Sequence, residues 1–127
     1  MRIHSYGKEF SPVIIMLPGS FCNADTMDNI IQQIRDEFHV LAVDYNGQYE
    51  GCDKVFTSRQ GEAAEIVQYL KEQSIGGVSL VYGQSMGGEM GMELISQLEK
   101  AGIPVKAAFF DGGPFLKFPK VVSRVLG

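Results

Sequence analysis

Cysteine, tryptophan and clusters of basic residues are scarce or absent in this sequence of 127 residues. It has no tryptophan and two cysteines, Cys22 and Cys52, whose spacing matches neither a disulfide framework nor a zinc site. Lysine and arginine form no run, and the net charge is −4. That balance disfavours nucleic acid and anionic membranes as partners. We therefore expect no metal and no nucleic-acid partner.

Long apolar runs are missing as well. No stretch approaches the ~18 residues that a membrane-spanning helix needs, and the N-terminal residues do not resemble a secretion signal. The sequence therefore predicts a cytoplasmic protein without a membrane partner. Neither G-x-G-x-x-G nor G-x-x-x-x-G-K-[ST] occurs, so we expect no nucleotide and no other cofactor.

Short apolar segments alternate with helical patterns along the chain. The segments that read as strands buried on both faces are residues 12–17, 39–44, 78–82 and 105–110. Residues 1–10 are mixed in polarity and fit an edge strand or a hairpin. Apolar stripes at helical spacing lie between these strands, and Thr57 with Gln60 fits a capping box for the second helix. This order predicts one α/β domain over residues 1–127, a three-layer αβα sandwich with a mostly parallel sheet.

One stretch combines a strand, a sharp turn and a helix rich in glycine. Its turn reads Gly83-x-Ser85-x-Gly87, the pattern of a nucleophile elbow, in which serine occupies a strained corner between small neighbours. A further glycine, Gly91, thins the helix that follows. Since each helical glycine costs ~1 kcal/mol relative to alanine, these glycines indicate a close approach of the helix to the sheet.

Reactive side chains follow the carboxyl ends of the predicted strands. They are Ser20 with Phe21, Asp44, Ser85 with Met86, and Asp111. In a parallel α/β sheet these ends share one rim, where ligands bind. Asp44 also fits a turn, because Gly47 follows it three residues later.

The sequence resembles the α/β-hydrolase fold family over roughly residues 10–115. The resemblance is carried, in the family's order, by Leu17-Pro18-Gly19-Ser20, Val43-Asp44-Tyr45-Asn46-Gly47 and Gly83-Gln84-Ser85-Met86-Gly87-Gly88. Pro18 departs from the family, which usually has His there. The resemblance implies a serine hydrolase that acts on an ester or thioester of a small acyl substrate. Ser85 would be the nucleophile, and the oxyanion donors would be the backbone N–H groups of Met86 and of Ser20, with Phe21 as a near alternative.

The sequence offers no clear candidate for the catalytic acid or for the catalytic base. Asp111 fits the acid of some family members, and it equally fits the start of a turn with Gly112 and Gly113. The family places its histidine after the serine, whereas this chain has only His4 and His39, both before it. We expect His39 to lie ~17–20 Å from the site, at the other end of its strand, and His4 to have a structural or solvent-exposed role.

The resemblance then implies that the chain is the N-terminal portion of a hydrolase domain whose C-terminal part is absent. Residues 113–127 would be the start of its lid. Two alternatives stay open: an acyltransferase that uses the same serine, and a non-catalytic fragment that binds an anion or other ligand at the helix N-terminus. We also expect self-association through the edge of strand 105–110, because Phe109 and Phe110 would both be partly exposed there.

Overall fold

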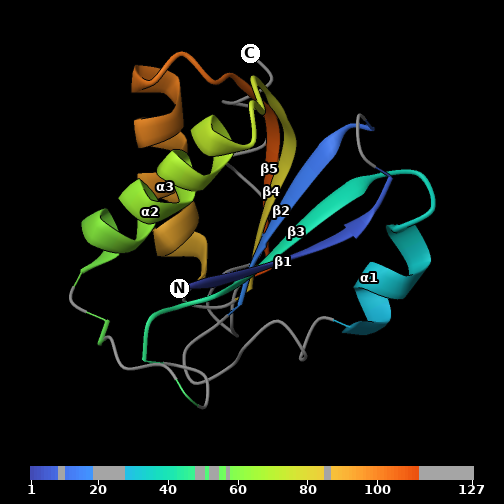
Figure 1. Cartoon of the computed structure of the whole chain (residues 1–127), viewed down its shortest axis with the longest axis horizontal. Coiled ribbons are helices and arrows are strands. Elements are labelled where there is room, and N and C mark those ends of the chain that lie inside the picture. The colour runs from blue at the N-terminus through green and yellow to red at the C-terminus, as the bar shows by residue number, and fades with distance from the viewer. Residues whose placement is uncertain are drawn as a thin grey trace.

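The described residues form a three-layer αβα sandwich (Figure 1). The computed structural model describes residues 1–8, 11–18, 28–47, 51, 55–56, 58–84 and 87–111, and for residues 28–30, 87, 88 and 111 the backbone alone. The elements in chain order are β1 (Arg2–Gly7), β2 (Val13–Leu17), α1 (Asp28–Ile34), β3 (His39–Asp44), α2 (Arg59–Glu72), β4 (Val78–Gln84), α3 (Gly87–Lys100) and β5 (Val105–Asp111).

The sheet is mostly parallel, as the sequence predicts. Its strand order is β1-β3-β2-β4-β5. The neighbouring pairs among β2, β3, β4 and β5 are parallel, and β1 lies antiparallel to β3 at one edge. Of the two readings of residues 1–10, the edge strand is the one that the structure contains.

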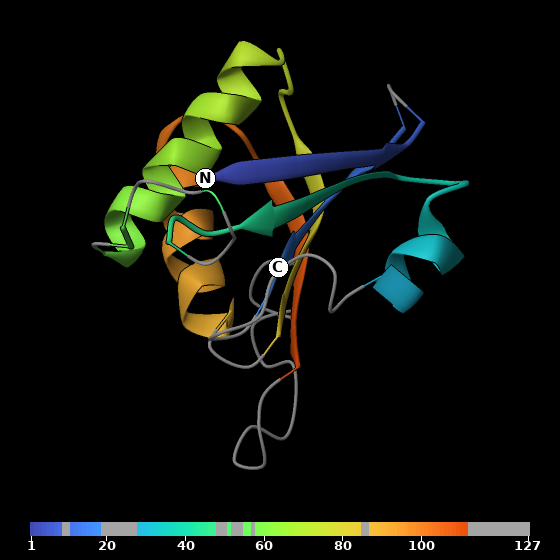
Figure 2. The same ribbon diagram turned by 60° about the horizontal axis from the view of Figure 1, so that its bottom comes forward.

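Both faces of the central strands are buried. All five residues of β2 are buried, and so are the last five of β3. One face packs Ile14, Met16, Val40 and Ala42 against Ile31 of α1, and the opposite face packs the alternate residues of β2 and β3 under α2 and α3. Figure 2 shows α1 on one side of the sheet and the α2–α3 pair on the other. Burial on both faces explains why these strands read as continuous apolar runs.

Helix α3 lies very close to β5. A Cβ atom placed on Gly91 would lie 2.4 Å from Cε1 of Phe110, which is closer than real Cβ contacts. The close approach predicted from the glycines is therefore confirmed at Gly91. The same contact corrects one expectation: Phe110 is 9% exposed and belongs to the core, whereas Phe109 is 40% exposed.

The N-cap of α2 differs from the predicted one by a residue. Ser58 is the N-cap, in an extended conformation, and its Oγ accepts a hydrogen bond from Gly61 N at 2.9 Å. The capping box of Thr57 and Gln60 is therefore wrong, since Gln60 lies inside the helix at its second position; Thr57 itself lies outside the described residues. No helix in the described part of the chain is long and apolar enough to cross a membrane.

The contact between Gly91 and Phe110 makes a testable prediction about stability. In Gly91→Ala, we expect the clash between the new methyl group and the Phe110 ring to lower the free energy of unfolding by about 1–3 kcal/mol. This loss cancels or outweighs the ~1 kcal/mol that alanine adds through its higher helix propensity. In a Phe110→Leu background the ring is gone, so the same substitution should be neutral or stabilising. Chemical denaturation of the four proteins gives the coupling energy. Equal effects of Gly91→Ala in both backgrounds would contradict the packing seen here.

Candidate active site

The carboxyl ends of the parallel strands lie together at one rim of the sheet. Leu17, the last residue of β2, pairs with Gly83 of β4. Gln84, the last residue of β4, pairs with Asp111, the last residue of β5. Consequently the segments that follow β2, β4 and β5 leave the sheet from neighbouring positions, where α/β sheets bind their ligands.

A very short connection joins β4 to α3 at this rim. The strand ends at Gln84 and the helix begins at Gly87, so only Ser85 and Met86 lie between them. A helix of 14 residues then leads away from the rim. Its N-terminus carries unpaired N–H groups and a partial positive charge, which favour an oxyanion nearby.

Most of the predicted site residues fall outside the described residues. These are Ser85 with Met86, and Ser20 with Phe21, so their roles stay predictions. Asp111 is described by its backbone alone, as the residue that closes β5 opposite Gln84. That position is one strand away from the connection that holds Ser85. The role of Asp111, as the acid or as the start of a turn, stays a prediction.

Neither histidine lies near the β4–α3 connection. His39 begins β3 and contacts Ser5 Oγ through Nε2 at 2.7 Å, at the end of the strand opposite to the rim. His4 lies on β1, which is separated from β4 by β3 and β2. Three strand spacings of about 4.8 Å put these two strands about 14 Å apart. These positions agree with the expectations that His39 lies far from the site and that His4 has a structural or solvent-exposed role.

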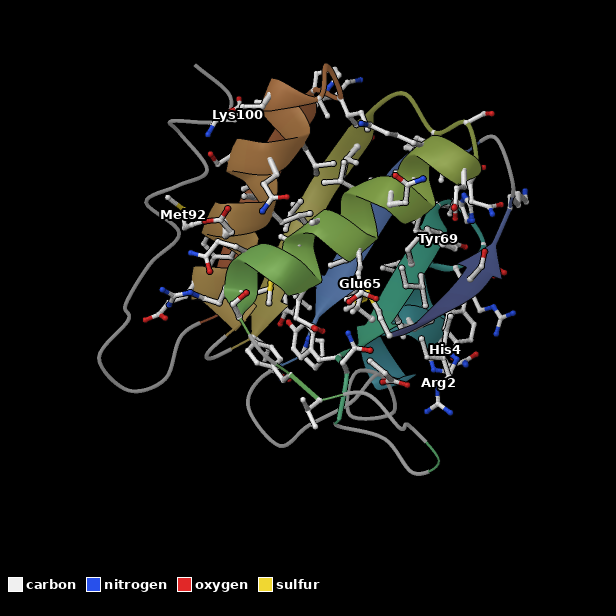
Figure 3. All side chains as sticks on the ribbon, turned by 60° about the vertical axis from the view of Figure 1, so that its left-hand side comes forward. Arg2, His4, Glu65, Tyr69, Met92 and Lys100 are labelled. Atoms are coloured by element: carbon white, nitrogen blue, oxygen red, sulfur yellow. The ribbon has the colours of Figure 1, made fainter. Side chains whose placement is uncertain are left out.

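The carboxylate of Asp44 anchors the edge strand β1. Asp44 is 1% exposed, and its Oδ2 accepts hydrogen bonds from Arg2 Nε and His4 Nε2, each at 2.8 Å. Figure 3 shows Arg2 and His4 side by side on β1. Because a buried carboxylate must be paired, Arg2 and His4 account for the burial of Asp44. This arrangement shows that Asp44 anchors β1, and it gives His4 a structural role. The expected turn after Asp44 is also present, at Asn46 and Gly47.

A second buried carboxylate, Glu62, fixes the chain just after β3. Glu62 is 1% exposed in the first turn of α2. Its Oε1 accepts from Asn46 N at 2.9 Å, and its Oε2 accepts from Asn46 Nδ2 at 2.7 Å. Asn46 also donates from Nδ2 to Glu65 Oε2 at 2.6 Å and accepts a short hydrogen bond from the Met1 ammonium through Oδ1.

Tyr45, which directly follows Asp44, links the end of β3 to the end of β2 through its side chain. Its side chain is buried, its ring meets Phe56 edge-on at 5.9 Å, and its hydroxyl donates to the Pro18 carbonyl at 3.2 Å. Burial and, next to it, the negative charge of Glu62 raise the pKa of Tyr45 far above its usual value. The phenol is therefore protonated and can act as a hydrogen-bond donor at any physiological pH.

Sequence reasoning did not single out Glu62, and one signal could have done so. Glu62 precedes Ile66 by four residues, so it lies on the apolar stripe of α2, where a charged side chain has to find a buried partner. Tyr45 carries no comparable signal, because a tyrosine after a strand is equally common on the surface.

The hollows found among the described residues lie away from the rim. One of about 220 Å³ is lined by Ser11, His39 and Ser74 at the amino ends of the strands, and another of about 350 Å³ lies between β1 and α2 beside Ile3 and Tyr69. No group of three His, Cys, Asp or Glu side chains suited to a metal ion occurs among the described residues.

Comparisons of sequence find nothing: no family model matches, and no curated protein matches either. Comparisons of structure find close matches. A protein from Desulfitobacterium hafniense, provisionally described as an α/β-hydrolase family protein, has a TM-score of 0.81 at 20% identity over 97% of this chain and 48% of its own. The type II thioesterase BorB from the borrelidin biosynthetic cluster has a TM-score of 0.75 at 23% identity over 85% of this chain and 47% of its own.

A third matched structure is described as an enzyme of ring cleavage, in contrast to the thioesterase. It is AqdC, in a variant studied for recognition and ring cleavage of the Pseudomonas quinolone signal, with a TM-score of 0.72 at 20% identity over 85% of this chain and 40% of its own. At these identities the matches establish the fold. The chain has the α/β-hydrolase fold, and it spans about half the length of the first two structures.

The connection between β4 and α3 makes a prediction about backbone conformation. We expect Ser85 to have a positive or otherwise strained φ, with Oγ directed at the carboxyl rim, since two residues must turn the chain from strand to helix. A crystal structure at high resolution measures this directly. Ordinary backbone angles with a buried Ser85 side chain would remove the basis for a nucleophile there.

Proposed function

We propose that this chain carries the nucleophile of a serine hydrolase that acts on esters or thioesters through an acyl-serine intermediate. The observation that carries the proposal is the two-residue connection between Gln84 and Gly87, which holds Ser85 within the pattern Gly83-x-Ser85-x-Gly87. The matched fold supports it, because BorB is a thioesterase. Since one fold can host several chemistries, the fold alone does not identify the reaction.

In the proposed reaction, Ser85 Oγ attacks the acyl carbonyl and loses its proton to a base. The carbonyl oxygen becomes an oxyanion, stabilised by the N–H groups of Met86 and of Ser20 or Phe21. Expulsion of the alcohol or thiol, which takes up the proton, leaves the acyl-serine. Water then attacks, with the same base removing its proton, to give the acid and free Ser85. An oxyanion donor of this kind contributes ~10²–10³ in rate.

Neither of the two histidines lies at the β4–α3 connection that holds Ser85. His39 lies at the wrong end of β3, and His4 is held on β1 by Asp44. We propose that a histidine from a segment outside these residues completes the site, with Asp111 beside it as the candidate acid. The partial coverage of the matched structures supports this arrangement. Water as the final acceptor is likewise part of the proposal, since acyl transfer to another alcohol proceeds through the same intermediate.

The nucleophile is tested in the natural open reading frame that contains these residues. We expect it to hydrolyse short p-nitrophenyl esters and acyl thioesters, and Ser85→Ala to lower kcat by on the order of 10³-fold or more. Ser79→Ala, in the same strand, is the matched control and should change kcat little. Undiminished turnover in Ser85→Ala would reject the proposed nucleophile. Tight anion binding without turnover would favour the binding alternative.

The 127-residue chain by itself should behave differently. We expect little or no ester turnover and slow or no labelling by a fluorophosphonate probe, because a serine without a base within ~2.6–3.2 Å is not activated. Gel fluorescence against the longer protein measures the difference. Rapid labelling of the short chain at Ser85 would mean that His4 or His39 serves as the base.

We further propose that the 127-residue chain self-associates through β5. Among the described residues β5 pairs only with β4, and Phe109 is 40% exposed, stacked on Tyr82 at 5.8 Å. Light scattering after size exclusion should find oligomers at micromolar concentration, reduced by Phe109→Lys. Met92→Lys is the matched control, since Met92 is 41% exposed on α3 (Figure 3). A clean monomer that melts cooperatively above ~50 °C would contradict this.

A further inference from the structure

The end of β3 is tied to the end of β2 by a continuous set of buried contacts. Glu62 of α2 accepts both hydrogen bonds that the backbone and the side-chain amide of Asn46 donate to it. Tyr45, the residue before Asn46, donates its hydroxyl to the Pro18 carbonyl. Glu62, Asn46 and Tyr45 are each at most 2% exposed, so water does not compete for these contacts.

The Pro18 carbonyl, which accepts the hydrogen bond from Tyr45, lies at the start of the loop after β2. Pro18 directly follows Leu17, the last residue of β2. Ser20 and Phe21, whose N–H groups are the proposed oxyanion donors, follow two and three residues after Pro18. The Tyr45 hydroxyl is therefore bonded to the backbone at the point where this loop leaves the sheet.

The chemistry of Tyr45 suits a permanent donor. Burial, assisted by the nearby Glu62 carboxylate, raises the pKa of its phenol, so the O–H is retained. The edge-on contact with Phe56 holds the ring from a second direction. Glu62 contributes by fixing the neighbouring peptide through Asn46, which sets where the Tyr45 backbone lies.

We propose that Tyr45, held in place by the contact between Glu62 and Asn46, is a positioning residue for the oxyanion loop after β2. This inference rests on the proposed function for its catalytic consequence. Among the described residues Tyr45 contacts Pro18 and Phe56, so its proposed effect on the reaction is indirect. Its effect arises because a donor misplaced by about 1 Å costs up to about 10²-fold in rate.

The test compares Tyr45→Phe with a matched control, Tyr69→Phe, in the natural full-length protein. Tyr69 lies on α2, facing the hollow between β1 and α2 (Figure 3). We expect Tyr45→Phe to lower kcat for ester hydrolysis about 10- to 100-fold with KM changed less than about threefold. Tyr69→Phe should change neither. Glu62→Gln, which places an amide against the Asn46 donors, should act in the same direction as Tyr45→Phe.

Hydrogen exchange separates this role from a purely structural one and from the proposed function. In Tyr45→Phe, exchange of the peptide covering residues 17–23 should become about tenfold faster or more, while peptides from β4 and α3 keep the wild-type rates. A lower melting temperature with unchanged loop exchange and unchanged kcat would overturn the proposal. If the wild-type protein has no Ser85-dependent turnover, the proposed function and its oxyanion loop fail, and the exchange data alone decide whether Tyr45 holds the segment.

Discussion

Burial of the central strands on both faces is the constraint from which the rest of the arrangement follows. Strands β2 and β3 have almost no exposed residues, so helices must cover both faces. Parallel strands covered in this way have to be joined by crossovers, and the crossovers bring the carboxyl ends of β2, β3, β4 and β5 to the same rim. The position of the candidate site is thus a consequence of packing: the pairing of Gln84 with Asp111 and of Leu17 with Gly83 already brings the relevant ends together.

Polar side chains are buried at the end of β3, and they need partners there. Two carboxylates, on opposite faces of the sheet, supply these contacts. Asp44 lies on the face that α1 covers and pairs with Arg2 and His4 of β1, whereas Glu62 comes from α2 on the other face and holds Asn46. Each carboxylate is satisfied by its own partners, as buried charges require. The edge strand β1 is thus attached by its side chains as well as by its ladder with β3. The two anchors together fix the chain where it leaves the sheet.

The sequence predicted most of the architecture and little of this polar network. Apolar runs and helical stripes identified the strands β2 to β5 and the helices, because burial of whole segments leaves a periodic pattern. Gly91 signalled a close approach that Phe110 then explains. The network was missed because its contacts join residues far apart in the chain, such as Asn46 with Glu62 and Tyr45 with Pro18, and no local pattern encodes them. The cap of α2 was misplaced by one residue, since Thr57 and Ser58 have the same chemistry and only geometry selects Ser58.

These anchors also determine which part of the rim is already filled by side chains. The rim at β3 is occupied by Asp44 with its partners from β1, and His4 is engaged there through Nε2, the nitrogen that meets the carboxylate. Tyr45 and Pro18 link the ends of β3 and β2. In the described part of the chain, by contrast, β5 has a strand neighbour on one side only, and it ends at Asp111 beside Gln84. Under the proposed function, a histidine that serves Ser85 would therefore approach from the β5 side of the sheet.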